Sequence, residues 1–163
     1  MRNKKWIIYI NLLIILAVAS AMIIKKEKTI KHGQIILLEL YGNDPRSLMQ
    51  GDYMSLSYQI EADKRAENSE EMNARGYYLL ERDSNRVVHY LGCENEKPQV
   101  DSNQVILKYY NYGDFGGESY FFEEGSGDDF ATARYGGFKI DTGGNPVLVG
   151  LYDDKFRILP LEK

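Results

Sequence analysis

The stretch that decides the architecture of this chain is WIIYINLLIILAVASAMII, residues 6–24. It carries no charge, and only Asn11 and Ser20 interrupt the apolar pattern. At a rise of about 1.5 Å per residue, a helix of this length spans about 28 Å, close to the hydrocarbon thickness of a bilayer. A helix that is apolar on all sides cannot be fully buried in the core of a domain as small as a chain of 163 residues can form. The sequence therefore predicts an N-terminal transmembrane helix, with the lipid bilayer as a partner of residues 6–24.

Basic residues flank this stretch on both sides, so the positive-inside rule gives nearly a tie. They are Arg2, Lys4, Lys5, Lys25, Lys26, Lys28 and Lys31. The order of basic start, apolar run and small residues at 17–21 resembles a secretory signal and favours a domain on the extracytoplasmic side. The small residues also fit a cleavage site, whereas the apolar continuation through Ile24 favours an uncleaved anchor. We expect a single-pass membrane protein.

Beyond the anchor (residues 1–24), the sequence predicts a basic juxtamembrane linker at 25–33 and one β-rich domain at 34–163. Without the first 24 residues the chain carries 17 basic and 24 acidic residues. An acidic domain repels phosphate backbones, so we expect no nucleic-acid partner. The only cysteine, Cys93, excludes an intrachain disulfide and a Cys-rich metal site.

Strand patterns recur through the domain at intervals of about ten residues. QIILLEL at 34–40 is a short apolar run typical of a strand covered on both faces, and residues 52–60 alternate between apolar and polar. Further strands are expected at 76–80, 86–91, 104–112, 119–123, 135–141, 147–152 and 156–159. The charged residues 61–75 fit a short solvated helix or an irregular excursion. The expected fold is mainly β: a small antiparallel barrel or sandwich with one or two short helices.

Residues 51–58, GDYMSLSY, match the pattern G-D-Y-x-x-L-x-Y at every fixed position: Gly51, Asp52, Tyr53, Leu56 and Tyr58. DPRSL at 44–48 precedes this motif, and the blocks YFFEEG, ATARYGGFKI and LVGLYDD follow it, at 120–125, 131–140 and 148–154. On these segments the chain resembles the GDYXXLXY family, named after the motif, over nearly its whole length. The resemblance implies a membrane-anchored protein, and it assigns no activity.

Physical chemistry gives the motif two interpretations. In the structural one, Gly51 supplies a turn, Asp52 bonds backbone amides at the strand start, and Leu56 and Tyr58 point into the core. In the functional one, Asp52 and Tyr53 belong to a surface cleft. The structural interpretation accounts for every fixed position without a ligand.

A second candidate site is the acidic cluster of Glu123, Glu124, Asp128 and Asp129. Together with Asp52, these carboxylates could bind a hard cation or perform acid–base hydrolysis. The spacing matches no calcium-binding loop, and acidic surface turns are common, so we expect no metal and no cofactor. We also expect Asp128 to cap a short helix that begins near it.

These observations favour a non-enzymatic, membrane-anchored binding or accessory domain, with a membrane or envelope component as its partner and a multi-pass membrane protein as one candidate. The alternative is a hydrolase, or a cation- or ligand-binding enzyme, that acts at the acidic cluster with Asp52. Convergence of Asp52 with Glu123, Glu124 and Asp129 in one pocket would favour the enzyme, because grouped carboxylates shift one another's pKa values.

Overall fold

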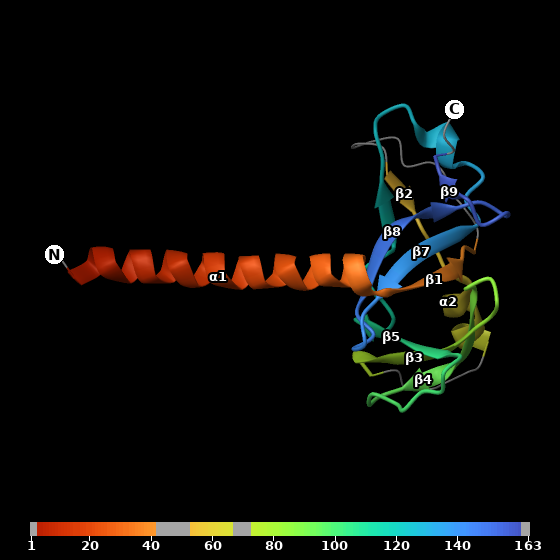
Figure 1. Cartoon of the computed structure of the whole chain (residues 1–163), viewed down its shortest axis with the longest axis horizontal. Coiled ribbons are helices and arrows are strands. Elements are labelled where there is room, and N and C mark those ends of the chain that lie inside the picture. The colour runs from red at the N-terminus through yellow and green to blue at the C-terminus, as the bar shows by residue number, and fades with distance from the viewer. Residues whose placement is uncertain (1–2, 42–52, 67–72, 161–163) are drawn as a thin grey trace.

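In the computed structural model, residues 3–41, 53–66 and 73–160 are described. A single long helix, α1 (Asn3–His32), projects like a rod from one side of a small β domain (Figure 1). Residues Lys5–His32 are long and apolar enough to cross a membrane, and none of their most apolar window is buried against the domain. This agrees with the predicted single-pass anchor.

The helix does not stop where the apolar run stops. Residues 25–32, expected as a linker, continue α1 without a break up to Gly33. Thr29 is buried, and its backbone oxygen accepts a hydrogen bond from Gly33 N at 2.8 Å. A Cβ at position 33 would lie 2.4 Å from that oxygen, so only glycine allows the sharp turn from helix into the first strand.

The rest of the described chain is mainly strand. Its elements are β1 (Gln34–Glu39), β2 (Tyr53–Ser55), α2 (Gln59–Ala66), β3 (Arg75–Arg82), β4 (Val88–Glu94), β5 (Gln104–Tyr110), β6 (Ser119–Phe121), the 3-10 helix η1 (Gly127–Phe130), β7 (Tyr135–Ile140), β8 (Pro146–Tyr152) and β9 (Ile158–Leu159). They form three antiparallel sheets with the orders β1-β7-β8-β9, β4-β3-β5 and β2-β6. The predicted antiparallel, mainly β class is confirmed.

Backbone hydrogen bonds join the sheets into a half-barrel. The first strand reaches the β3–β4 turn through Leu37 N and Arg86 O at 2.8 Å. The edge of β5 reaches the β7–β8 turn through Lys108 N and Gly144 O, also at 2.8 Å. Beyond β1, Leu40 forms an antiparallel bridge with Tyr58. The sheets therefore share one core.

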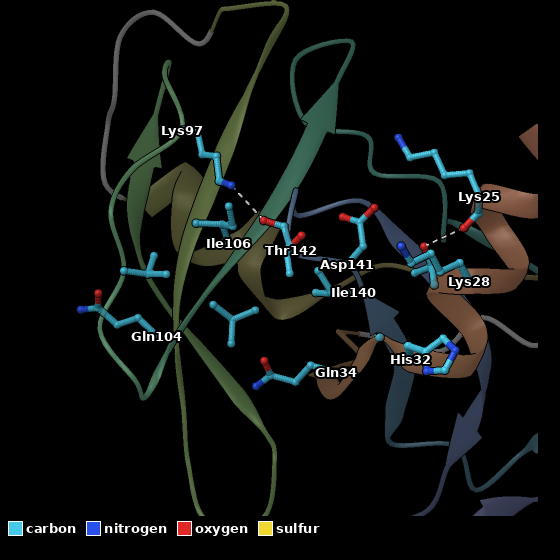
Figure 2. Close-up of a pocket in the computed structure, with 14 residues that line it drawn as sticks. Lys25, Lys28, His32, Gln34, Lys97, Gln104, Ile106, Ile140, Asp141 and Thr142 are labelled. Atoms are coloured by element: carbon cyan, nitrogen blue, oxygen red, sulfur yellow. Dashed lines mark hydrogen bonds between the residues drawn. The ribbon is translucent and has the colours of Figure 1, made fainter.

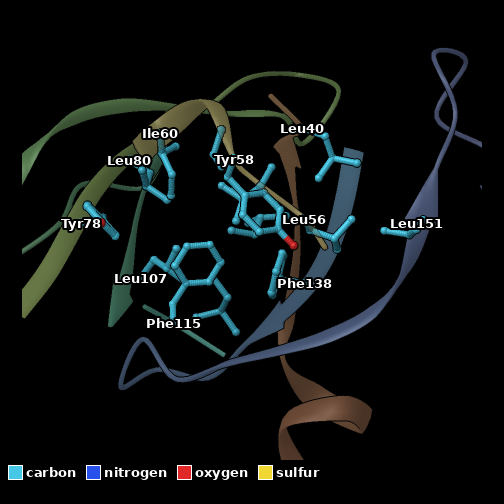
Figure 3. Packing of buried hydrophobic residues seen from close by; sticks show 14 of the residues in the cluster. Leu40, Leu56, Tyr58, Ile60, Tyr78, Leu80, Leu107, Phe115, Phe138 and Leu151 are labelled. Carbon is cyan, nitrogen blue, oxygen red and sulfur yellow. The ribbon is translucent and has the colours of Figure 1, made fainter. Parts of the chain in front are cut away.

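That core is aromatic at its centre (Figure 3). Tyr58, Tyr78 and Tyr109 are among the largest fully buried side chains, which explains much of the high tyrosine content as packing. Tyr78 lies 4.8 Å from Tyr109 and 6.4 Å from Phe115, measured between ring centroids. Leu56, Leu80 and Leu107 pack in the same cluster.

Two local predictions need correction. The strand expected at 52–60 is regular only at Tyr53–Ser55, and Gln59 and Ile60 already belong to α2. Its alternation is nevertheless right, because Met54, Leu56, Tyr58 and Ile60 are all buried.

The helix cap is also misplaced. The N-cap of η1 is Ser126, which makes no side-chain capping bond. Asp128 lies inside the first turn of the 3-10 helix, two residues beyond the N-cap position.

Candidate functional site

In the described part of the GDYXXLXY motif, residues 53–58, the alternate side chains of Met54, Leu56 and Tyr58 are buried in the core. Gly51 and Asp52 lie outside the described residues, so their predicted roles stay predictions. Tyr53 is half-buried, and its ring lies 5.7 Å from that of Phe121, its register partner on β6. Leu56 and Tyr58 are buried as predicted.

Tyr58 is buried at the centre of the core, where it makes both a hydrogen bond and ring contacts. Its hydroxyl donates a hydrogen bond to the backbone oxygen of Gly117 at 2.5 Å, and its ring lies 5.0 Å from Phe115 and 5.6 Å from Phe138. Burial raises the pKa of this phenol far above its usual value, and the carboxylates of Glu118 and Glu61 raise it further. The hydroxyl therefore stays protonated as a structural donor.

The acidic cluster is present as a set of exposed side chains. Glu123 and Glu124 follow β6, Asp128 and Asp129 lie on η1, and all four are exposed. Within the described residues, no three His, Cys, Asp or Glu side chains come close enough to hold a metal ion. Because Asp52 lies outside this part of the chain, its convergence with the cluster stays untested.

A pocket lies elsewhere, at the junction of α1 with the β domain (Figure 2). It has a volume of about 580 Å³, within the usual range for ligand sites. One side is the last two turns of α1, with Lys25, Lys28 and His32; the other is formed by the β5 strand, the segment before it and the β7–β8 turn. We call this pocket the junction cleft.

The junction cleft combines a basic rim with an apolar floor. Lys97 faces the two helix lysines from the opposite wall, where its Nζ donates a hydrogen bond to Thr142 O at 2.9 Å (Figure 2). Ile106 and Ile140 are buried and supply apolar surface. Three ammonium groups around an apolar floor suit an amphipathic anion.

Among the described residues that line the cleft, Asp141 is the one acid, and hydrogen bonds hold its carboxylate in place. Its carboxylate accepts hydrogen bonds from Gly143 N and from Asn145 N and Nδ2, each at 2.9 Å. Burial raises the pKa of Asp141, but these bonds and the charge of Lys25 outweigh it and hold the pKa below its usual value. Asp141 thus shapes the turn through its hydrogen bonds and offsets part of the charge of Lys25. Lys28 and Lys97 remain available to another anion.

The junction cleft was not predicted from the sequence. The sequence predicts residues 25–33 as a basic juxtamembrane linker whose lysines lie among anionic headgroups, and it does not predict that they meet the β domain. The signal that was available is the lack of any Gly or Pro between Ile24 and Gly33, which predicts that the helix continues and carries its lysines to the domain.

Comparison with protein families places residues 15–151 within the GDYXXLXY protein family. This span contains the motif, the junction cleft and most of the β domain. Comparisons with curated proteins and with solved structures found no match.

Proposed function

Because the chain belongs to the GDYXXLXY protein family, whose name records a motif and no chemistry, we propose its function from geometry and position. It is a membrane-anchored, non-enzymatic binding module whose partner is an integral membrane protein. Its domain lies on the extracytoplasmic side, as the signal-like N-terminus favours.

The observation that carries the proposal is Asn11. It lies within the apolar span, is exposed on α1, and makes no side-chain hydrogen bond to any described residue. A carboxamide in hydrocarbon costs free energy unless it finds a partner, and Asn side chains in membranes commonly bond across to a neighbouring helix. A transmembrane helix of another protein supplies the missing acceptor and donor.

The junction with the domain supports the same proposal. Lys26 Nζ donates to Pro146 O at 3.2 Å, and Lys139 Nζ donates to Gly33 O at 3.1 Å. With the buried Thr29, these contacts fix the domain to the helix, so no free linker separates them. A partner that binds α1 in the bilayer therefore meets a domain of defined orientation just above it.

The competing enzyme has less support. Glu123, Glu124, Asp128 and Asp129 are all exposed, and none of them lines the junction cleft. A hydrolase needs carboxylates that are held against a substrate in a protected site. The binding module needs only the helix and the surfaces near it.

Site-specific photocrosslinking in the native membrane tests the proposal. Ile15 lies four residues beyond Asn11, on the same side of the helix, whereas Leu13 lies two residues beyond it, on the opposite side. A photoreactive residue at 15 is expected to capture a discrete larger protein, and one at 13 is not. The variant Asn11→Leu should reduce the capture at 15, while the matched Ser20→Ala should leave it unchanged, because a hydroxyl can bond within its own helix.

Two outcomes would contradict this function. Equal capture from positions 13 and 15 means that α1 has no binding face. A product with twice the mass of the chain means that the partner is a second copy and not another membrane protein.

A further inference from the structure

The length of α1 beyond its apolar run determines how far the junction cleft lies from the hydrocarbon of the bilayer. The apolar run ends at Ile24, and α1 continues straight to His32. At about 1.5 Å per residue, Lys28 lies about 6 Å beyond the end of the run and His32 about 12 Å. A headgroup layer is about 5–8 Å thick on each side of the hydrocarbon, so Lys25 and Lys28 lie at headgroup height.

The last two turns of α1 carry net positive charge, whereas the β domain carries net negative charge. From residue 25 onward the chain carries an excess of acids, yet residues 25–32 hold four lysines and one glutamate. That glutamate, Glu27, pairs with Lys31 at 3.8 Å, outside the cleft. Within the described residues, Lys28 makes no ion pair or side-chain hydrogen bond. The cleft is lined by three lysines and the carboxylate of Asp141, so it presents net positive charge at the membrane surface.

From this arrangement we propose that the junction cleft binds the phosphate of an anionic phospholipid. The ammonium groups of Lys25, Lys28 and Lys97 surround the phosphate, since each can donate up to three hydrogen bonds. One N–H of the Lys97 ammonium donates a hydrogen bond to Thr142 O, and the other two can donate to the ligand. Ile106 and Ile140 contact the glycerol and the first carbons of the chains.

A membrane lipid fits this site better than a soluble phosphate for two reasons. The floor of the cleft is apolar, and free phosphate gains nothing from it. The cleft also opens beside a helix that already lies among lipid headgroups, where the local concentration of lipid phosphate is high. This inference rests on the membrane insertion of α1, which is part of the proposed function, but not on the protein partner.

The test uses the purified full chain in nanodiscs of equal parts phosphatidylcholine and phosphatidylglycerol, with no other protein present. Native mass spectrometry of the released chain should show retained phosphatidylglycerol in clear excess over phosphatidylcholine. The pair Lys28→Gln and Lys97→Gln should lower the retained phosphatidylglycerol by at least about five-fold, the effect expected for even one lysine at an anionic surface. Lys28→Gln alone should act in the same direction, and it removes no contact within the described domain.

The matched control is Lys31→Gln with Lys155→Gln, which removes the same charge outside the cleft. Retention in this pair should change less than about two-fold. Equal loss in both pairs, or equal retention of the two lipids by the unmodified chain, overturns the site. Displacement of the lipid by 10 mM inorganic phosphate overturns the lipid assignment. A chain that fails to insert into the nanodiscs overturns the proposed function as well.

Discussion

The variant Tyr58→Phe isolates one hydrogen bond at the centre of the fold. It removes only the hydroxyl that donates to Gly117 O at 2.5 Å and keeps the ring among Phe115 and Phe138. Gly117 is buried, so its carbonyl loses a partner that water cannot easily replace. A buried acceptor left unpaired costs about 1–3 kcal/mol, so we expect Tyr58→Phe to lower the free energy of unfolding by that amount. For a domain of this size the loss lowers Tm by roughly 3–12 °C.

The same variant has a signature at alkaline pH. The pKa of Tyr58 is raised by burial in the folded state, so the folded protein keeps the phenolic proton while the unfolded chain releases it above about pH 10. The stability contributed by this group is complete below pH 10 and is lost as pH rises further, by about 1.4 kcal/mol per pH unit. Above pH 10, stability should therefore fall less steeply in Tyr58→Phe than in the unmodified chain.

Thermal unfolding of the full chain in detergent micelles, followed by near-ultraviolet circular dichroism, measures both effects. Tyr112→Phe is the matched control, because Tyr112 is 66% exposed and its hydroxyl has no partner among the described residues. The control should stay within about 0.5 kcal/mol of the unmodified chain. A Tyr58→Phe variant as stable as the control, with the same alkaline slope as the unmodified chain, would refute the role given to this hydroxyl.

Three further predictions concern the motif and the topology. Leu56→Ala should cost about 2–5 kcal/mol, as a large-to-small change of a buried residue does, and chemical denaturation showing under about 0.5 kcal/mol would contradict its placement in the core. If Asp52 forms a turn, Asp52→Asn should be mild and Asp52→Ala should cost about 1–2 kcal/mol in thermal unfolding, whereas an Asn variant more stable than the unmodified chain would indicate a charged functional site. In a Cys93→Ser background, Ser84→Cys should react with a membrane-impermeant thiol reagent on intact cells, and labelling only after lysis would place the domain on the other side.

Features that depend on local pattern were predictable from the sequence. The length and apolar character of the uncharged run at 6–24 are explained by the thickness of a bilayer. The burial of Leu56 and Tyr58 follows from the alternation of apolar and polar residues along the segment. The strands expected at 76–80 and 86–91 leave a short connection between them, and in the structure the carboxylate of Asp83 accepts hydrogen bonds there from Asn85 N and Val87 N, both at 2.8 Å. Each of these features is decided within about twenty consecutive residues of the chain.

Features that depend on distant segments were not predictable. Residues 53–60 alternate like a strand, but the backbone leaves β2 after Ser55 and enters α2 at Gln59. The alternation of apolar and polar residues indicates only which side chains are buried. The backbone pairing is set by distant segments: the N–H of Leu56 donates a hydrogen bond to Glu118 O, and Tyr58 forms an isolated antiparallel β-bridge with Leu40. The junction cleft similarly requires the bend at Gly33 and the β7–β8 turn to meet, a contact between segments about one hundred residues apart.

The described part of the motif, residues 53–58, packs together segments that lie far apart in the chain. Tyr58 contacts Phe138 of the ATARYGGFKI block, and a Cβ at Gly136 of the same block would lie 2.9 Å from the Tyr58 ring. The hydroxyl of Tyr58 then secures the Gly117 loop that leads into β6. Tyr58 thus requires a glycine at position 136 on β7, and Phe138 requires a glycine at position 117 before β6, where a Cβ would lie 2.3 Å from its ring. The binding surfaces of such a protein should therefore be sought outside the motif, on α1 and at the junction cleft, where exposed Asn11 and unpaired Lys28 are not needed by the core.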